Sequence, residues 1–141
     1  MKHVAIVLDA NILIRAVLGK RVRELIQAHA GSVQFFAPDV AYADARKYLP
    51  ALLEKRGVSA IPALQVLDAL ERIVLPVDME VYGGLQQPAL RRIEMRDADD
   101  WPILACAMAL GCPIWTEDAD FFGTGVATWT SDRVALYLAN A

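Results

Sequence analysis

The stretch VAIVLDANIL, residues 4–13, contains the transition that decides the fold. Its first five residues are apolar without interruption and partly β-branched, which is typical of a strand buried on both faces of a parallel sheet. Asp9 ends this run, and a helical pattern begins at Ile12. The sequence therefore predicts a buried strand that delivers an aspartate to the carboxyl edge of a sheet, where sites form in open parallel sheets.

Segments of strand and helix character alternate along the rest of the chain. Further strands are predicted at residues 33–37, 73–75, 113–116 and 126–129. Helices are predicted at residues 12–18, 21–30, 38–56, 59–71, from 78 onwards, 99–110 and 131–138. This alternation favours the α/β class, as a three-layer α/β/α sandwich with a mainly parallel central sheet. At 141 residues the chain fits a single domain over residues 1–141.

Two residues lead to specific local expectations. Pro50 lies inside the predicted helix 38–56 and should kink or split it, because proline cannot donate the helical hydrogen bond. Ser131 precedes the last apolar segment and is a favoured residue for capping a helix.

Composition and charge limit the location and partners of the protein. No apolar run reaches about 18 residues, so no transmembrane helix is expected. The apolar start of the chain is interrupted by Asp9 and Asn11, which argues against a signal peptide and favours the cytoplasm. The net charge of -3 is not typical of a nucleic-acid binder, although bound divalent cations reverse the sign of an acidic cleft. Basic residues occur in small groups that resemble solvated helix faces: Lys20, Arg21 and Arg23; Lys47; Lys55 and Arg56; Arg91, Arg92 and Arg96.

Acidic residues follow two of the predicted strands. Asp9 comes directly after the first strand, and Asp118 and Asp120 follow the strand at 113–116. Because the carboxyl ends of parallel strands meet at one edge of a sheet, these carboxylates should gather there.

A third acidic group precedes the apolar helix at 99–110. Asp97, Asp99 and Asp100 come just before Pro102, a residue that fits the first turn of a helix. Capping of free N–H groups explains one or two of these acids. It does not explain why another acidic cluster follows the next strand, after a helix of the right length to return the chain to the same edge.

The convergence of these acids indicates a metal site. Like charges repel when they are brought together, and a cation that neutralises them removes the penalty. Oxygen ligands favour Mg²⁺ or Mn²⁺ over zinc. These ions can activate water and stabilise a phosphoryl transition state. The competing interpretation is a set of solvated caps and turns.

Two segments of the sequence resemble a known family. VLDANIL, residues 7–13, resembles the opening motif of PIN domains, in which an aspartate ends the first strand and a small polar residue follows two positions later. DWPILACAMALGCPIWTEDADF, residues 100–121, resembles the second half of that family: an acid opens a helix rich in small residues, then come a glycine, an apolar strand, a threonine and another acid. The chain is thus similar to PIN-domain nucleases, and its size resembles that of VapC-type toxins of toxin–antitoxin systems.

The resemblance also assigns the candidate site. A further family acid, most often glutamate, sits on the helix after the second strand, where this chain has Asp44. Aspartate is one methylene shorter, so a bridging water is expected between Asp44 and the metal. The resemblance implies a metal-binding and catalytic quartet of Asp9, Asp44, Asp100 and Asp118. Asn11 and Thr116 are expected to support the quartet by hydrogen bonds, with Asp97 and Asp120 as reserve ligands, and Asp97 or Asp99 replaces Asp100 if the register differs.

The function implied by the resemblance is cleavage of single-stranded RNA with Mg²⁺ or Mn²⁺. It also implies a homodimer and an antitoxin protein whose tail enters the cleft. The alternative is a catalytically weak RNA-binding or interaction module of PIN fold, which Asp44 and the low basic content favour. A phosphatase of the haloacid-dehalogenase type is disfavoured, because its chemistry requires an aspartate where this chain has Asn11.

Overall fold

A five-stranded parallel sheet forms the centre of the computed structural model, which describes residues 4–141. The strands lie in the order β3-β2-β1-β4-β5. Their bounds are β1 (Val4–Leu8), β2 (Val33–Pro38), β3 (Val74–Val77), β4 (Ile114–Trp115) and β5 (Thr128–Trp129). The chain moves outward from β1 to β3 and then returns to β4 on the other side of β1. The order of the strands therefore reverses between β1 and β4, which is where ligands bind in open α/β sheets.

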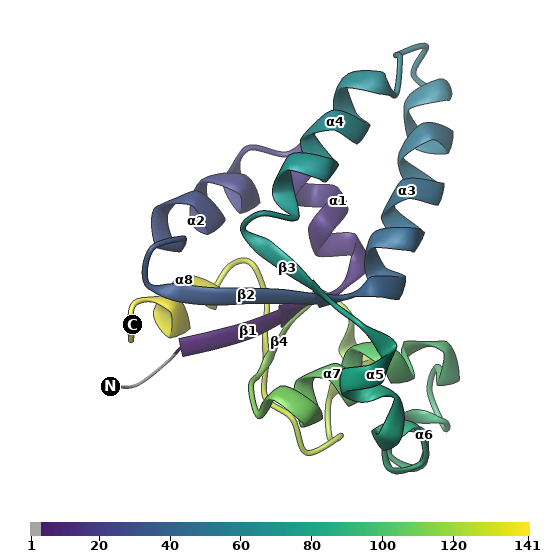
Figure 1. The fold of residues 1–141 in the computed structure, drawn as a ribbon, viewed down its shortest axis with the longest axis vertical. Coiled ribbons are helices and arrows are strands. Elements are labelled where there is room, and N and C mark those ends of the chain that lie inside the picture. Colours follow the sequence, from purple (N-terminus) through teal and green to yellow (C-terminus); the bar gives the residue numbers. More distant parts are fainter. Residues whose placement is uncertain (1–3) are drawn as a thin grey trace.

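Helices cover both faces of the sheet, so the predicted three-layer α/β/α architecture is confirmed (Figure 1). One layer contains α1 (Ala10–Leu18), α2 (Arg21–His29), α3 (Asp39–Glu54) and α4 (Ile61–Leu70). The opposite layer contains α5 (Met79–Tyr82), α6 (Gln86–Ile93) and α7 (Trp101–Leu110). Short 3₁₀ turns occur at η1 (Gly83–Leu85), η2 (Ala98–Asp100) and η3 (Ala119–Phe121), and α8 (Val134–Leu138) closes the chain. Within residues 4–141, no helix is long and apolar enough to span a membrane.

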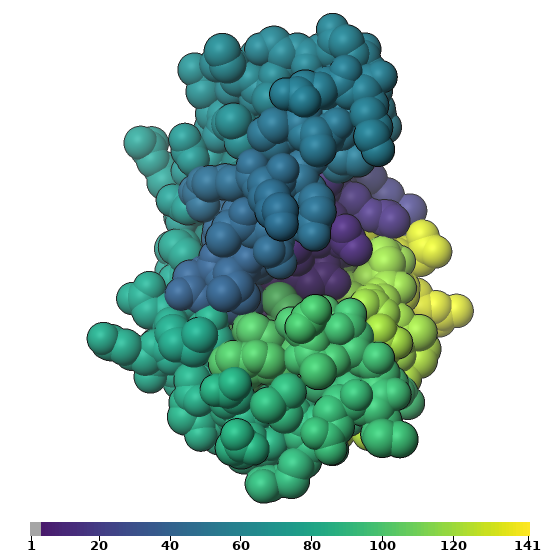
Figure 2. Space-filling model, turned by 90° about the vertical axis from the view of Figure 1, so that its right-hand side faces the viewer, coloured from purple at the N-terminus to yellow at the C-terminus, as the bar shows by residue number. Residues whose placement is uncertain are grey.

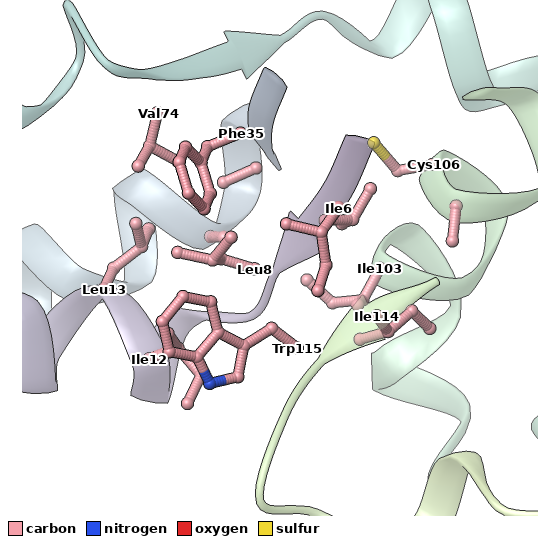
Figure 3. Packing of buried hydrophobic residues seen from close by; sticks show 14 of the residues in the cluster. Ile6, Leu8, Ile12, Leu13, Phe35, Val74, Ile103, Cys106, Ile114 and Trp115 are labelled. Atoms are coloured by element: carbon pink, nitrogen blue, oxygen red, sulfur yellow. The ribbon is translucent and has the colours of Figure 1, made fainter. Parts of the chain in front are cut away.

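The core is built around β1, as its uninterrupted apolar sequence predicts. Ile6 and Leu8 are fully buried because β1 has a strand on each side and helices on both faces. Figure 3 shows these side chains among those of α1, α7 and the neighbouring strands. Trp115 of β4 is the largest fully buried side chain. The burial of Leu8 and Trp115 fixes the two strand ends after which the acidic residues follow.

Helix α7 is apolar on all sides and contacts β1, β2 and β4. The small residues Ala105 and Ala107 are buried and allow the helix to pack closely against the sheet. Cys106 and Cys112 are buried free thiols. The helix ends at Gly111, whose φ of 65° lies in the left-handed region that glycine adopts without strain.

Two local expectations have outcomes in the structure. Pro50 does not split α3, which is continuous over Asp39–Glu54; the buried side chains of Leu49 and Leu53 pack on both sides of the proline. Ser131 does not cap the last helix, which begins three residues later. Its hydroxyl instead accepts a hydrogen bond from Nε1 of buried Trp115 at 3.0 Å, because a buried indole N–H requires a partner.

Candidate active site

A cleft of about 180 Å³ lies beyond the carboxyl ends of β1 and β4. It is bounded by the first turns of α1, one side of α3 and the start of α7. In the space-filling view of Figure 2, purple residues from the start of the chain lie recessed between blue residues of α3 and the green segment around the start of α7. Six of the candidate residues named from the sequence line this cleft together: Asp9, Asn11, Asp44, Asp99, Asp100 and Asp118.

Asp9 has two structural roles besides its place in the cleft. As the N-cap of α1, its Oδ1 accepts a hydrogen bond from the backbone N–H of Ile12 at 3.0 Å. Its Oδ2 accepts a hydrogen bond from the hydroxyl of Thr116. Only 8% of the residue is exposed, and this burial raises the pKa of Asp9, while the two hydrogen bonds oppose the shift. Each carboxylate oxygen retains a further lone pair for a cation.

Thr116 joins Asp9 to the loop that follows β4. Its hydroxyl donates to Asp9 and accepts from the backbone N–H of Asp118 at 2.9 Å. Oδ1 of Asp118 in turn accepts from the backbone N–H of Asp120 at 2.9 Å. This chain of hydrogen bonds gives the loop a defined path and places Asp118 in the cleft.

Asp100 has a buried carboxylate oxygen, Oδ2, that no hydrogen bond from the described residues satisfies. Burial raises the pKa of Asp100 to about 7, with smaller contributions from the negative charges of Asp97, Asp118, Asp9 and Asp120. An unpartnered carboxylate oxygen surrounded by other carboxylates is costly to ionise, and a bound cation relieves that cost. The site therefore fits a divalent cation.

Asp97 and Asp120, which we expected only as reserve ligands, lie close to Asp100. Carboxylate oxygens of Asp97, Asp100 and Asp120 all lie within 4.8 Å of one another. Asp100 thus belongs both to this triad, in which only Asp97 is exposed, and to the quartet at the cleft. One oxygen of Asp97 is already occupied, because it accepts a hydrogen bond from the backbone N–H of Asp99 at 3.0 Å. We give more weight to the quartet because it includes the buried carboxylate of Asp9.

Asp44 projects from α3 and is exposed at the wall of the cleft. It forms no ion pair within residues 4–141. The nearby cation Arg46 contacts α4 instead, with Asp68 at 3.3 Å and Glu71 at 2.5 Å. Pairing with neighbours on the helix therefore does not account for Asp44, and residues two and three positions along, Arg46 and Lys47, include no partner for it.

Other residues near the site were missed by the sequence reasoning. Tyr48 lines the cleft one helical turn after Asp44, a position that the spacing of four residues could have identified. Arg92 and Arg96 are not simply parts of a solvated helix face. Arg92 donates to the carbonyl of Thr124 at 3.2 Å, and Arg96 donates to the carbonyl of Asp120 at 3.0 Å. Both arginines therefore brace the loop that carries the acids after β4.

Comparisons with known proteins place this geometry in context. A sequence model described as PIN domain matches residues 7–139. The fold is similar to the crystal structure of PAE2754 from Pyrobaculum aerophilum, at 15% identity and a TM-score of 0.73, covering 98% of this chain and 91% of that one.

Two further solved structures have a similar fold. VapBC2 from Rickettsia felis, bound to a DNA fragment from its promoter, matches at 15% identity and a TM-score of 0.64, covering 89% of this chain and 98% of that one. FitAB bound to an IR36 DNA fragment matches at 22% identity and a TM-score of 0.60, covering 89% and 94%. No curated protein sequence matches the chain.

The raised pKa of Asp100 predicts how stability depends on pH in the absence of metal. Its folded pKa of about 7 exceeds the ordinary value of 3.8, so stability is lost as the pH rises between these values. With EDTA present, the protein should melt at a lower temperature at about pH 8 than at about pH 5.5. Asp100→Asn should remove much of this difference in thermal unfolding followed by circular dichroism. Equal pH dependence of the melting temperature in the variant and the wild type would contradict a raised pKa of Asp100 in the folded protein.

Proposed function

The chain belongs to the PIN-domain family, and we propose that it is a metal-dependent endoribonuclease that cleaves phosphodiester bonds in single-stranded RNA. The observation that carries the proposal is the unpartnered Oδ2 of Asp100, which lies in one cleft with the carboxylates of Asp9 and Asp118. These groups occupy the carboxyl edge of the sheet at its switch point, where an α/β fold binds its ligands.

The donor set favours Mg²⁺ or Mn²⁺, because all the candidate ligands are oxygen atoms. The proposed ligands are Asp9, Asp44, Asp100 and Asp118. The chemistry that a divalent cation supplies at such a site is polarisation of the phosphate and activation of water.

The surrounding residues orient these ligands and receive the substrate. Thr116 holds one oxygen of Asp9, so that the carboxylate presents a fixed face to the cleft. Asn11 is exposed at the first turn of α1 and makes no side-chain hydrogen bond to the quartet among the described residues, unlike the expected support; its amide is free to donate to a phosphate oxygen. A cleft of about 180 Å³ holds only a short part of a nucleic acid.

The nuclease proposal predicts metal-dependent cleavage. Purified protein with Mn²⁺ should cut an unstructured RNA, and EDTA should abolish the activity. Asp9→Asn should reduce kcat/KM by more than about 100-fold, because losing a direct ligand exceeds the usual cost of losing a supporting residue. DNA of the same sequence serves as the control for sugar specificity. Equal cleavage rates for the wild type and Asp9→Asn would contradict the proposal. Cleavage of DNA but not of RNA would mean that the protein is a deoxyribonuclease.

A second candidate function is a catalytically weak RNA-binding or interaction module. It is favoured by the exposed position of Asp44 and its short side chain. If Asp44 assists the metal through water, Asp44→Glu should maintain or raise kcat/KM with Mn²⁺, and Asp44→Asn should lower it by roughly 10- to 100-fold. RNA binding that is independent of metal, with no cleavage by the wild type or Asp44→Glu, would favour the module.

We also propose that the protein is the toxin of a toxin–antitoxin pair, acting in the cytoplasm as a homodimer with an antitoxin partner. The resemblance to VapC-type toxins and the similar folds of VapBC2 and FitAB support this proposal.

The toxin proposal predicts growth arrest. Expression of the wild type in a bacterial host should stop growth, whereas Asp9→Asn at equal protein level should not. Co-expression of a small DNA-binding protein encoded beside the gene should restore growth. Normal growth with active soluble nuclease present would contradict the toxin role while leaving the nuclease proposal intact.

A further inference from the structure

Tyr48 is an exposed aromatic residue at the rim of the acidic cleft. Half of its surface, 50%, is accessible, although it lines the same cleft as Asp9 and Asp100. It lies four residues after Asp44 on α3, and residues at this spacing share one face of a helix. An aromatic ring is therefore held one turn away from a candidate metal ligand.

The environment of Tyr48 differs from that of the other tyrosine on α3. Tyr42 is buried, and its hydroxyl donates to the carbonyl of Val74 at 2.5 Å, so it serves the core. The hydroxyl of Tyr48 has no hydrogen-bond partner in the part of the chain that the structure describes. The ammonium group of Lys47 lies over the ring, 5.8 Å from its centroid. About half of Tyr48 therefore stays open to solvent at the cleft.

The neighbours of Tyr48 on α3 show where the cleft ends and which positive charge lies near the ring. Leu52, one turn further along α3, is also partly exposed at 38%, but it does not line the cleft. The ammonium group of Lys47 lies over the Tyr48 ring and leaves the stacking role to the opposite face, and its neighbour Arg46 is engaged with α4. An aromatic face beside a cation is the combination that proteins use for single-stranded nucleic acids, with the ring for a base and the cation for the backbone.

We propose that Tyr48 is a stacking platform for the base of a nucleotide next to the scissile phosphate. This inference rests on the proposed ribonuclease function and adds a substrate-binding residue to it. Because every base has a π face, stacking on Tyr48 strengthens binding of single-stranded RNA without selecting a sequence. A duplex does not offer its bases in this way, since they are stacked on one another. Tyr48 thus contributes to the preference for single strands.

A graded set of substitutions tests the role of the ring. We measure KM and kcat for Mn²⁺-dependent cleavage of an unstructured RNA oligonucleotide. Tyr48→Ala and Tyr48→Leu should lower kcat/KM by roughly 5- to 100-fold, mainly through KM, because loss of one stacked base has an effect of this size. Tyr48→Phe keeps the aromatic face and should stay within about twofold of the wild type. Leu52→Ala is the matched control on the same helix and should leave both constants unchanged.

A second measurement tests stacking directly. The substrate is varied by placing one abasic nucleotide at each position around the cleavage site. At one of these positions, loss of the base should lower kcat/KM for the wild type. The same abasic substrate should cause no further loss with Tyr48→Ala, because the ring and the base act as a pair. A merely structural role of Tyr48 would not produce this coupling to a single base.

The outcomes separate this inference from the function on which it rests. If the wild type cuts no RNA, both the ribonuclease proposal and the role of Tyr48 are overturned. If the wild type cuts RNA but Tyr48→Leu has the same kcat/KM, or no abasic position couples to Tyr48, only the stacking role is overturned.

Discussion

The hydrogen bonds to Asp9 connect the scaffold to the site. One carboxylate oxygen caps α1 and the other accepts from Thr116, so a single side chain links β1, α1 and the segment after β4. β1 can hold this aspartate in place because Ile6 and Leu8 are fully buried between the two helical layers. The position of the site thus depends on the packing of the strand that precedes it.

The same arrangement makes ionisation of the site's carboxylates unfavourable when no cation is bound. Burial and neighbouring carboxylates raise the pKa of both Asp9 and Asp100, which means that their charged forms are disfavoured in the folded chain. Arg92 and Arg96 stabilise the adjoining loop, but they donate to backbone carbonyls and not to these carboxylates. The fold therefore supplies the geometry of the site, and the proposed cation would offset the remaining electrostatic cost.

Much of the fold and the meeting of the acids could be predicted because local patterns determine them. The apolar run before Asp9 and the proline after Asp100 fix a strand end and a helix start, and parallel strands bring these ends together. Features that depend on tertiary packing were not predictable in this way. The proximity of Asp97 to Asp120 depends on how two loops fold against each other, and Ser131 turned out to serve the indole of Trp115. The exposure of Tyr48 depends on where α3 lies relative to the cleft.

The link between Asp9 and Thr116 also has a consequence for synthesis of the protein. These two residues are 107 positions apart in the chain, yet their side chains form a hydrogen bond at the cleft. A nascent polypeptide that has left the ribosome only as far as α7 contains Asp9 and Asp100 but neither Thr116 nor Asp118. Incomplete chains therefore lack an assembled site. Under the proposed nuclease function, a chain becomes active only after the segment beyond β4 has been made and has met Asp9.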